Sequence, residues 1–221
     1  SAYYEHTFLS DQMGIEMVEA SDLYVENDLV YMKTVDGPKK VDVIYRRIDD
    51  NYIDPLFYNA DSVIGVPGII HAYRTGGVNI CSAPGCGIAD DKAIYIYVPE
   101  MIKFYLGEMP ILENVETWRC EKDDELKYVL ENIKNLVVKE VDGSGGYGML
   151  IGPKSTEKTI EQFSLKLKNN PKGYIAQPTL DLSSSPTLID NEITGRRVDL
   201  RPYCLIGKQA QLCPGGLTRV A

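Results

Sequence analysis

A lysine and four glycines lie close together near the middle of the chain. Lys139 follows the apolar residues 136 to 138, and the glycines fall within residues 143 to 148. Glycine weakens regular structure and a lysine is awkward to bury, so this pattern needs a reason other than core packing. Backbone N–H groups of a glycine loop can surround phosphate oxygens, and a lysine on the incoming strand can reach the same anion. The segment therefore indicates a flexible hairpin that folds over phosphates.

The glycine spacing matches G-x-G-x-x-G at Gly143, Gly145 and Gly148, but its context differs from the common nucleotide-binding loops. A dinucleotide-binding loop leads from a strand into a helix, whereas this loop leads into another strand-like segment. No Lys-Ser or Lys-Thr follows the last glycine, and Lys139 precedes the loop, opposite to the order in protein kinases. Ser144 can add a hydroxyl donor. A glycine-rich surface hairpin after a lysine explains the same residues, and the loop alone does not decide between the two.

Alternating charges near the end of the chain form a second candidate site. The period of a strand places Arg197, Asp199 and Arg201 on one face. Two cations around one carboxylate make a preorganised surface for phosphate or carboxylate, and Arg219 follows a glycine turn nearby. A surface ion-pair ladder is the alternative.

Two adjacent arginines, Arg46 and Arg47, leave a predicted strand and enter an acidic segment at residues 49 to 54. The fork of an arginine recognises a carboxylate through two hydrogen bonds, so this pair could bind the carboxylate of a substrate. Arginines at a strand end are also commonly just solvated. The sequence leaves both roles open.

The elements that must position these groups alternate between helix and strand, which predicts an α/β (α+β) fold. In the first part, we expect a helix that ends at Gly14 and a hairpin that turns at Asn27 and Asp28. The other elements expected there are strands at residues 15–19, 40–48 and 78–84 and a helix that ends at Gly76.

In the second part, the apolar period predicts amphipathic helices at residues 123–136 and 156–170, the first with an aspartate cap. Pro99 should start or kink a helix within residues 92–107. Strands are expected at residues 136–141, 147–152, 174–178 and 197–207, with irregular backbone at residues 181–192.

Composition limits the class of protein. The chain has 221 residues, of which 44% are hydrophobic and 25% charged, as in soluble globular proteins of one or two domains. The net charge of −9 argues against nucleic acid as a partner, and no apolar run is long enough to span a membrane. Five cysteines without a C-x-x-C pair and only two histidines argue against a disulfide framework, a zinc site or a Ser-His-Asp triad. No signal peptide is recognisable, and we expect a cytoplasmic protein.

Several longer segments occur in an order that resembles the circularly permuted ATP-grasp proteins of type 2, relatives of the glutathionylspermidine synthases. They include "VDVIYRRIDDNYIDPL", "VVKEVDGSGGYGM", "YIAQPTL", "RRVDLRP" and "PGGLTRVA". These segments cover most of the chain and are more specific than the glycine triplet. The resemblance implies a Rossmann-like pre-ATP-grasp region at residues 1–87 and an incomplete ATP-grasp domain at residues 88–221.

The resemblance also implies the chemistry. ATP-grasp enzymes hold ATP between two α+β lobes and transfer its γ-phosphate to a carboxylate, and an amine then attacks the acyl phosphate. The expected function is therefore a carboxylate–amine ligase that uses ATP and Mg²⁺ and takes a small-molecule or peptide acid and an amine as substrates. A non-catalytic nucleotide-binding scaffold and a phosphotransferase are the alternatives.

Roles for individual residues follow from the same resemblance. Lys92 and Lys139 would contact the α- and β-phosphates, because phosphoryl transfer depends mainly on positioning and on cations. Arg197, Arg201 and Arg219 would stabilise the transferred phosphoryl group or bind the acid. The flexible lid would consist of Gly143, Ser144, Gly145, Gly146, Tyr147 and Gly148. The hinge against adenine would include Gln177, Pro178 and Leu180.

The metal is the point at which the chain departs from the family pattern. The resemblance places the acidic residue and the asparagine that bind Mg²⁺ beyond Ala221, which leaves Asp199 as a weak candidate ligand within the chain. Asp199 is better explained as the ion-pair partner of its neighbouring arginines. We therefore expect a central fragment of a longer protein, which by itself could lack activity. The oligomeric state is not predictable from the sequence.

Overall fold

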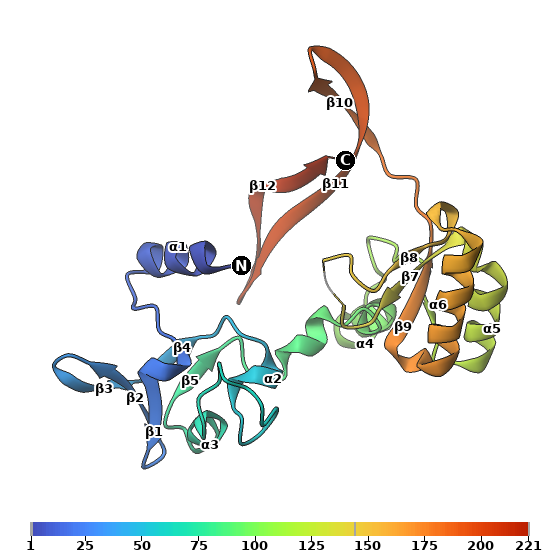
Figure 1. Ribbon diagram of the computed structural model, residues 1–221. Helices are drawn as coiled ribbons and strands as arrows, with labels where there is room; N and C mark the ends of the chain where they lie inside the picture. The colour runs from blue at the N-terminus through green and yellow to red at the C-terminus, as the bar shows by residue number, and fades with distance from the viewer. Residues whose placement is uncertain (1, 144, 221) are drawn as a thin grey trace. The chain divides into compact units, whose positions relative to one another are not determined.

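The computed structural model describes residues 2–143 and 145–220, and the chain forms two compact units (Figure 1). The units are Ser1–Val98 and Pro99–Ala221. Helices and β-sheets occur in both, which confirms the predicted mixed α and β fold. The division into functional regions after residue 87 stays a prediction. None of the described helices is long and apolar enough to cross a membrane.

The first unit contains short helices and two small sheets. Its helices, including 3-10 helices, are α1 (Tyr3–Met13), η1 (Ala20–Asp22), α2 (Asp50–Ile53), α3 (Ile69–Thr75), η2 (Cys86–Asp90) and η3 (Ile94–Tyr97). Gly14 and Gly76 end α1 and α3 as predicted, with φ of 65° and 84°. The strand predicted at residues 15–19 is wrong. Its first residue hydrogen-bonds to the end of α1, and its last residue caps the start of η1. The N–H of Ile15 donates to a carbonyl of α1, and Glu19 caps η1.

The sheets of the first unit bring two distant segments together. The strands are β1 (Leu23–Glu26), β2 (Leu29–Thr34), β3 (Gly37–Val41), β4 (Val43–Tyr45) and β5 (Asn79–Cys81). The predicted hairpin turn at Asn27 and Asp28 is confirmed, with φ of 50° and 65°. The single strand predicted at residues 40–48 is instead two strands. β3 pairs antiparallel with β2, whereas β4 runs parallel to β5, and the Asp42 carbonyl between them accepts the N–H of Asn79 at 2.8 Å.

One buried carboxylate lies beside the core of the first unit. Apolar side chains from β1, β2, β5 and α3 form this core, and Asp54, only 1% exposed, lies beside it. The Asp54 carboxylate accepts N–H groups from Leu56, Gly68 and Ile70 at 2.9, 3.1 and 3.0 Å. These bonds replace the water that the charge loses on burial, and they fix the start of α3.

The second unit contains a sheet with strand order β6-β9-β7-β8 and helices on one face. The strands are β6 (Trp118–Arg119), β7 (Leu136–Glu140), β8 (Leu150–Ile151) and β9 (Tyr174–Pro178). The helices, including 3-10 helices, are α4 (Val98–Leu106), α5 (Asp123–Asn132), η4 (Ile133–Asn135), η5 (Gly152–Lys154), α6 (Glu157–Asn169) and η6 (Pro171–Gly173). Pro99 lies in the first turn of α4, as predicted.

Helices α5 and α6 lie along the sheet and share its core (Figure 1). Both predicted amphipathic helices are confirmed, and Thr156 caps α6 by accepting the N–H of Thr159 at 3.2 Å. The predicted aspartate cap of α5 is wrong, because Lys122 occupies that position and Asp123 lies in the first turn. There its charge still faces the positive end of the helix dipole.

A three-stranded ribbon follows, formed by β10 (Ser184–Ile189), β11 (Glu192–Ile206) and β12 (Ala210–Val220) (Figure 1). The irregular backbone predicted at residues 181–192 is therefore wrong over β10, and β12 was not predicted. β11 also starts earlier than predicted, because a tight turn at Asp190 and Asn191, with φ of 48° and 66°, joins it to β10.

Candidate functional site

The two faces of the four-stranded sheet differ in chemistry. Val138 and Ala176 are fully buried beneath α5 and α6, while their neighbours Lys139 and Gln177 are half-buried on the other face. Alternation along each strand separates these residues in this way. Polar side chains from three strands therefore gather on the face that α5 and α6 leave uncovered.

A chain of hydrogen bonds crosses this face. The Lys139 ammonium donates to the Gln177 Oε1 at 2.8 Å, and the Gln177 Nε2 donates to the Thr117 hydroxyl at 2.9 Å. The pairing of Val137 with Gln177 and of Lys139 with Ile175 sets Lys139 and Gln177 diagonally across β7 and β9. Gln177 thus fixes the direction of the lysine, which presents a preorganised cation.

Arg119 on β6 is a basic residue on this face that the sequence analysis missed. Both Arg119 and Lys139 pair with Ile175, from opposite sides of β9. The register therefore places two cationic residues in one row of the face opposite α5 and α6, on either side of the buried Ile175. The N–H of Arg119 donates to a carboxylate oxygen of Glu125 at 2.5 Å, which ties this strand to α5. Only a strand assignment for the segment "TWRC" could have revealed it.

The glycine loop joins β7 to β8 at the end of this face. Gly145, Gly146 and Gly148 have φ of 67°, 81° and 66°, in the left-handed region that side chains disfavour. These three glycines are exposed, Tyr147 is 84% exposed, and the Glu140 carboxylate lies against Gly148. Gly143 is half-buried, and the predicted donor Ser144 lies outside the described residues. The second predicted strand is shorter than residues 147–152, because four residues of that range belong to the loop or to η5.

The predicted arginine cluster lies on the ribbon. Asp199 pairs with Arg219 in the register of β11 and β12 and accepts its backbone N–H at 3.0 Å. The guanidinium of Arg201 lies 3.3 Å from the same carboxylate. These contacts lower the pKa of Asp199, the backbone bond from Arg219 foremost and the Arg201 bond and charge after it. Arg197 instead pairs with Asp181 and donates to the Leu182 carbonyl.

The residues predicted to form the adenine hinge lie at the end of β9. Gln177 and Pro178 are the last two residues of the strand, and Leu180 follows, 53% exposed. The Thr179 hydroxyl donates to the Asn135 carbonyl at 3.1 Å, which anchors the chain after the strand. Contact of these residues with adenine stays a prediction.

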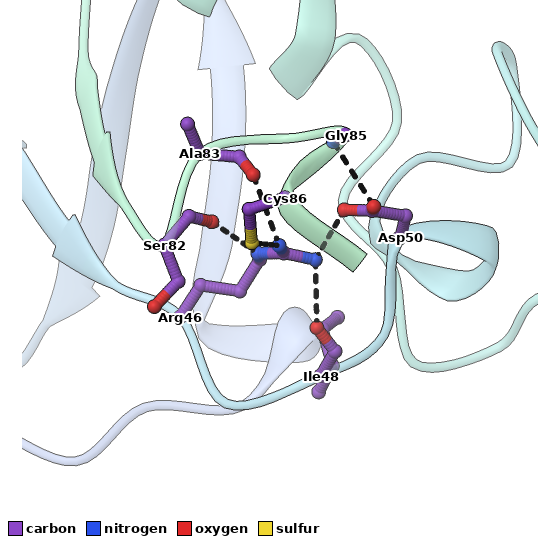
Figure 2. A network of polar contacts seen from close by, with 7 residues as sticks. All are labelled: Arg46, Ile48, Asp50, Ser82, Ala83, Gly85 and Cys86. Carbon is purple, nitrogen blue, oxygen red and sulfur yellow. Dashed lines mark hydrogen bonds and ion pairs between the residues drawn. The ribbon is translucent and has the colours of Figure 1, made fainter. Parts of the chain in front are cut away.

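Three predicted residues lie in the first unit. Lys92 is half-buried in the turn before η3. Arg47 forms an ion pair with Glu5 of α1. The Arg46 side chain is only 7% exposed and lies among protein acceptors (Figure 2). Recognition of a substrate by Arg46 or Arg47 is untested, and the burial of Arg46 favours a role inside the fold.

Comparison with known proteins identifies the family. Residues 1–221 match the family model described as circularly permuted ATP-grasp type 2. The chain belongs to this ATP-grasp family. It is 51% identical over its whole length to an uncharacterized protein of Synechocystis, of which it covers 46%. It is also 50% identical to an uncharacterized protein of Mycobacterium tuberculosis, of which it covers 40%.

A relative with a functional name is found in Frankia casuarinae. The chain is 39% identical to its "Putative glutamate--cysteine ligase 2-2" and covers 26% of that protein. The ATP-grasp chain thus spans less than half the length of each of these relatives.

ATP-grasp proteins generally use ATP and Mg²⁺, and the two groups fit this chain differently. The row of cations beside an accessible glycine backbone suits a polyphosphate. Among the described residues, no cluster of three or more His, Cys, Asp or Glu side chains could hold a metal ion. The carboxylate of Asp199 is engaged by the Arg201 guanidinium and the Arg219 N–H, so its role as a metal ligand stays a prediction.

Proposed function

We propose that this chain is the nucleotide-binding part of an ATP-dependent carboxylate–amine ligase that acts through an acyl phosphate. The observation that carries the proposal is the Lys139–Gln177–Thr117 chain of hydrogen bonds on the face of the sheet opposite α5 and α6, in the strand that leads into the glycine loop. A cation whose direction is already fixed loses little freedom when a phosphate binds.

The roles proposed for the phosphate-binding groups follow from this placement. Lys139 binds a phosphate of ATP, and Arg119 binds the same polyphosphate from the opposite side of Ile175. Backbone N–H groups of the loop at residues 143 to 148 cover the phosphates and exclude water from the acyl phosphate. Lys92 is proposed as a further phosphate contact.

The chemical steps proposed require positioning and charge more than covalent catalysis. A carboxylate oxygen of the acid attacks the γ-phosphorus, and ADP leaves with the electron pair of the broken P–O bond. The amine then attacks the acyl carbon, releases inorganic phosphate and loses a proton. Arg197, Arg201 and Arg219 would stabilise the transferred phosphoryl group or bind the acid, and Mg²⁺, with Asp199 as its candidate ligand, would neutralise phosphate charge.

The Frankia relative supports a class of substrate. Its name describes the ligation of two amino acids, glutamate and cysteine. We propose that the acid and the amine used here belong to the same class, amino acids or short peptides. This relative favours a ligase over a nucleotide-binding scaffold or a phosphotransferase.

Titration calorimetry with ATP and Mg²⁺ tests the binding role. Lys139→Met removes a charged hydrogen bond and should weaken binding about tenfold or more. Lys158→Met, at an exposed position of helix α6, is the matched control and should bind like the unsubstituted chain. Equal affinity for the Lys139→Met variant and the unsubstituted chain would refute the proposed site.

Turnover by the full-length protein tests the reaction. ADP and phosphate should appear only when both an acid and an amine are supplied from a panel of amino acids, polyamines and short peptides. Nucleotide binding without turnover would indicate a scaffold. A phosphorylated acceptor that accumulates without amine would indicate a phosphotransferase.

A further inference from the structure

The guanidinium of Arg46 is held by acceptors from two segments of the first unit (Figure 2). Its Nε donates to the Ser82 carbonyl at 2.8 Å, and its terminal nitrogens donate to the Ala83 and Ile48 carbonyls at 3.3 and 2.9 Å. A further contact of 3.4 Å reaches the Cys86 sulfur. The backbone N–H of Arg46 also donates to the Cys81 carbonyl at 3.3 Å. One residue therefore binds the chain at several points between β5 and η2.

Asp50 completes this network from α2. One carboxylate oxygen lies 2.5 Å from the Arg46 guanidinium, and the other accepts the N–H of Gly85 at 3.0 Å (Figure 2). Ser82 and Gly85 have φ of 62° and 91°, in the left-handed region. Ser82 adopts this conformation at a cost that a non-glycine residue must recover from other contacts. The bonds of Arg46 and Asp50 on either side supply them.

The loop held in this way has a position that suits ligand binding. It follows β5 at the carboxyl end of the parallel pair β4 and β5. In open α/β sheets, ligands bind beyond the carboxyl ends of the parallel strands. Arg46 and Asp50 belong to the segment that follows β4, and the loop that they hold follows β5. The segments after both parallel strands therefore meet in one cluster.

Hydrogen-bonded turns connect this loop to Lys92. The N–H of Cys86 donates to the Ala83 carbonyl at 3.1 Å, and the N–H of Asp91 donates to the Ile88 carbonyl at 3.3 Å. The Asp91 carboxylate then accepts the N–H of Ala93 at 2.7 Å. Each of these turns is closed by a hydrogen bond, so bonded turns link the anchored start of the loop to residue 92.

We infer that Arg46 and Asp50 are a positioning pair that holds residues 82 to 91 in one conformation and thereby places Lys92 for phosphate binding. This inference depends on the proposed function for the role of Lys92, but the structural part does not. Arg46 acts by holding the loop in place. In this account it does not bind the substrate carboxylate, which other residues bind. Charge alone is insufficient for this role, because the guanidinium fork serves several acceptors at once.

A double-mutant cycle on ATP affinity tests the inference. Arg46→Gln and Lys92→Met are each expected to weaken binding about fivefold, while the double variant should be no weaker than Lys92→Met alone. Arg46→Lys keeps the charge and should not restore affinity. Asp50→Asn tests the same cluster with a smaller change. Arg74→Gln, at an exposed position of α3 in the same unit, is the matched control and should leave affinity unchanged.

Hydrogen exchange of the peptide that covers residues 82 to 91 gives a readout that needs no nucleotide. Arg46→Gln and Asp50→Asn should accelerate exchange there, while peptides from β1 and β2 keep their protection and so show that the unit is folded. Unchanged exchange in residues 82 to 91, or additive losses of affinity in the cycle, would overturn the inference. Absence of ATP binding by the unsubstituted chain would overturn the proposed function and the role of Lys92, and exchange would still decide the positioning of the loop.

Discussion

Asp54 shows how one buried charge organises the backbone around it. Its two carboxylate oxygens accept three N–H groups, from Leu56, Gly68 and Ile70. Asp54→Ala leaves these donors without their acceptor, and the free energy of unfolding of the first unit should fall by about 3 kcal/mol. Urea denaturation measures this change. Asp61→Ala, at an exposed position of the same loop region, is the control and should change stability little.

The buried thiol of Cys120 makes stability depend on pH. Burial, and to a smaller extent the Glu125 charge, raises the pKa of Cys120 from 9.0 to about 12. The folded thiol stays protonated at a pH where the unfolded thiol ionises, so the unfolded state gains stability as the pH rises. The free energy of unfolding should therefore be constant below pH 9 on this account and fall between pH 9 and about 12.

Cys120→Ala should reduce the slope of stability against pH in this window. Some slope should remain, because burial and the Glu140 charge also raise the pKa of Tyr174. Cys204→Ala, at an exposed position of the ribbon, is the matched control and should leave the slope unchanged. Equal slopes for the Cys120→Ala and Cys204→Ala variants would contradict the role given to Cys120.

Close packing of two elements makes one glycine of the second unit indispensable. Gly152, after β8, lies against η4, and an added Cβ would meet the Ile133 carbonyl oxygen at 2.1 Å and Lys134 backbone atoms at 2.7 Å. Backbone atoms cannot move aside as a side-chain end can. Gly152→Ala should destabilise this unit by about 2 kcal/mol in urea denaturation. Gly207→Ala, where no atom lies within 4 Å, should be close to neutral, and similar losses for both variants would contradict this account.

Elements with a strong local signal were predictable from the sequence, β7 and β9 among them, whereas β6 and β12 lack such a signal and were missed. α5 and α6 repeat apolar residues at helical spacing, and the Asn27-Asp28 turn fixes its own hairpin. β6 has two residues and exists only because it pairs with β9, more than fifty residues later. β12 was missed because Pro214 and the two glycines after it are untypical of a strand. In the structure, these residues lie where the pairing of β12 with β11 changes register.

The same distinction applies to the candidate site. Lys139 and the glycines were recognisable from residue types and spacing. The bond between Lys139 and Gln177 depends on a register that joins residues 38 positions apart. Arg119 enters the site through the pairing of β6 with β9, so only a strand assignment for its segment could have pointed to it. Sequence thus indicated which groups could bind phosphate, and strand pairing decided which of them share a face.

At the scale of the molecule, the ribbon exposes apolar side chains that a monomeric protein usually covers. Leu200, Leu205, Ile206 and Leu212 are 71%, 71%, 84% and 67% exposed. An environment-sensitive dye such as anilinonaphthalene sulfonate should bind there. Replacement of Leu200 and Leu212 by serine should lower the dye fluorescence, whereas Thr187→Ser and Thr194→Ser on the same ribbon should not. Equal fluorescence from both double variants would contradict this assignment.

Strand β11 is 15 residues long and is paired by β10 over its first part and by β12 over its second part. Residues 192–197 of β11 pair with β10, and residues 198–206 pair with β12 around a break in register at Pro202 and Cys204. One strand thus belongs to two successive hairpins. A slip of β11 by one residue would turn its side chains to the other face in both hairpins at once.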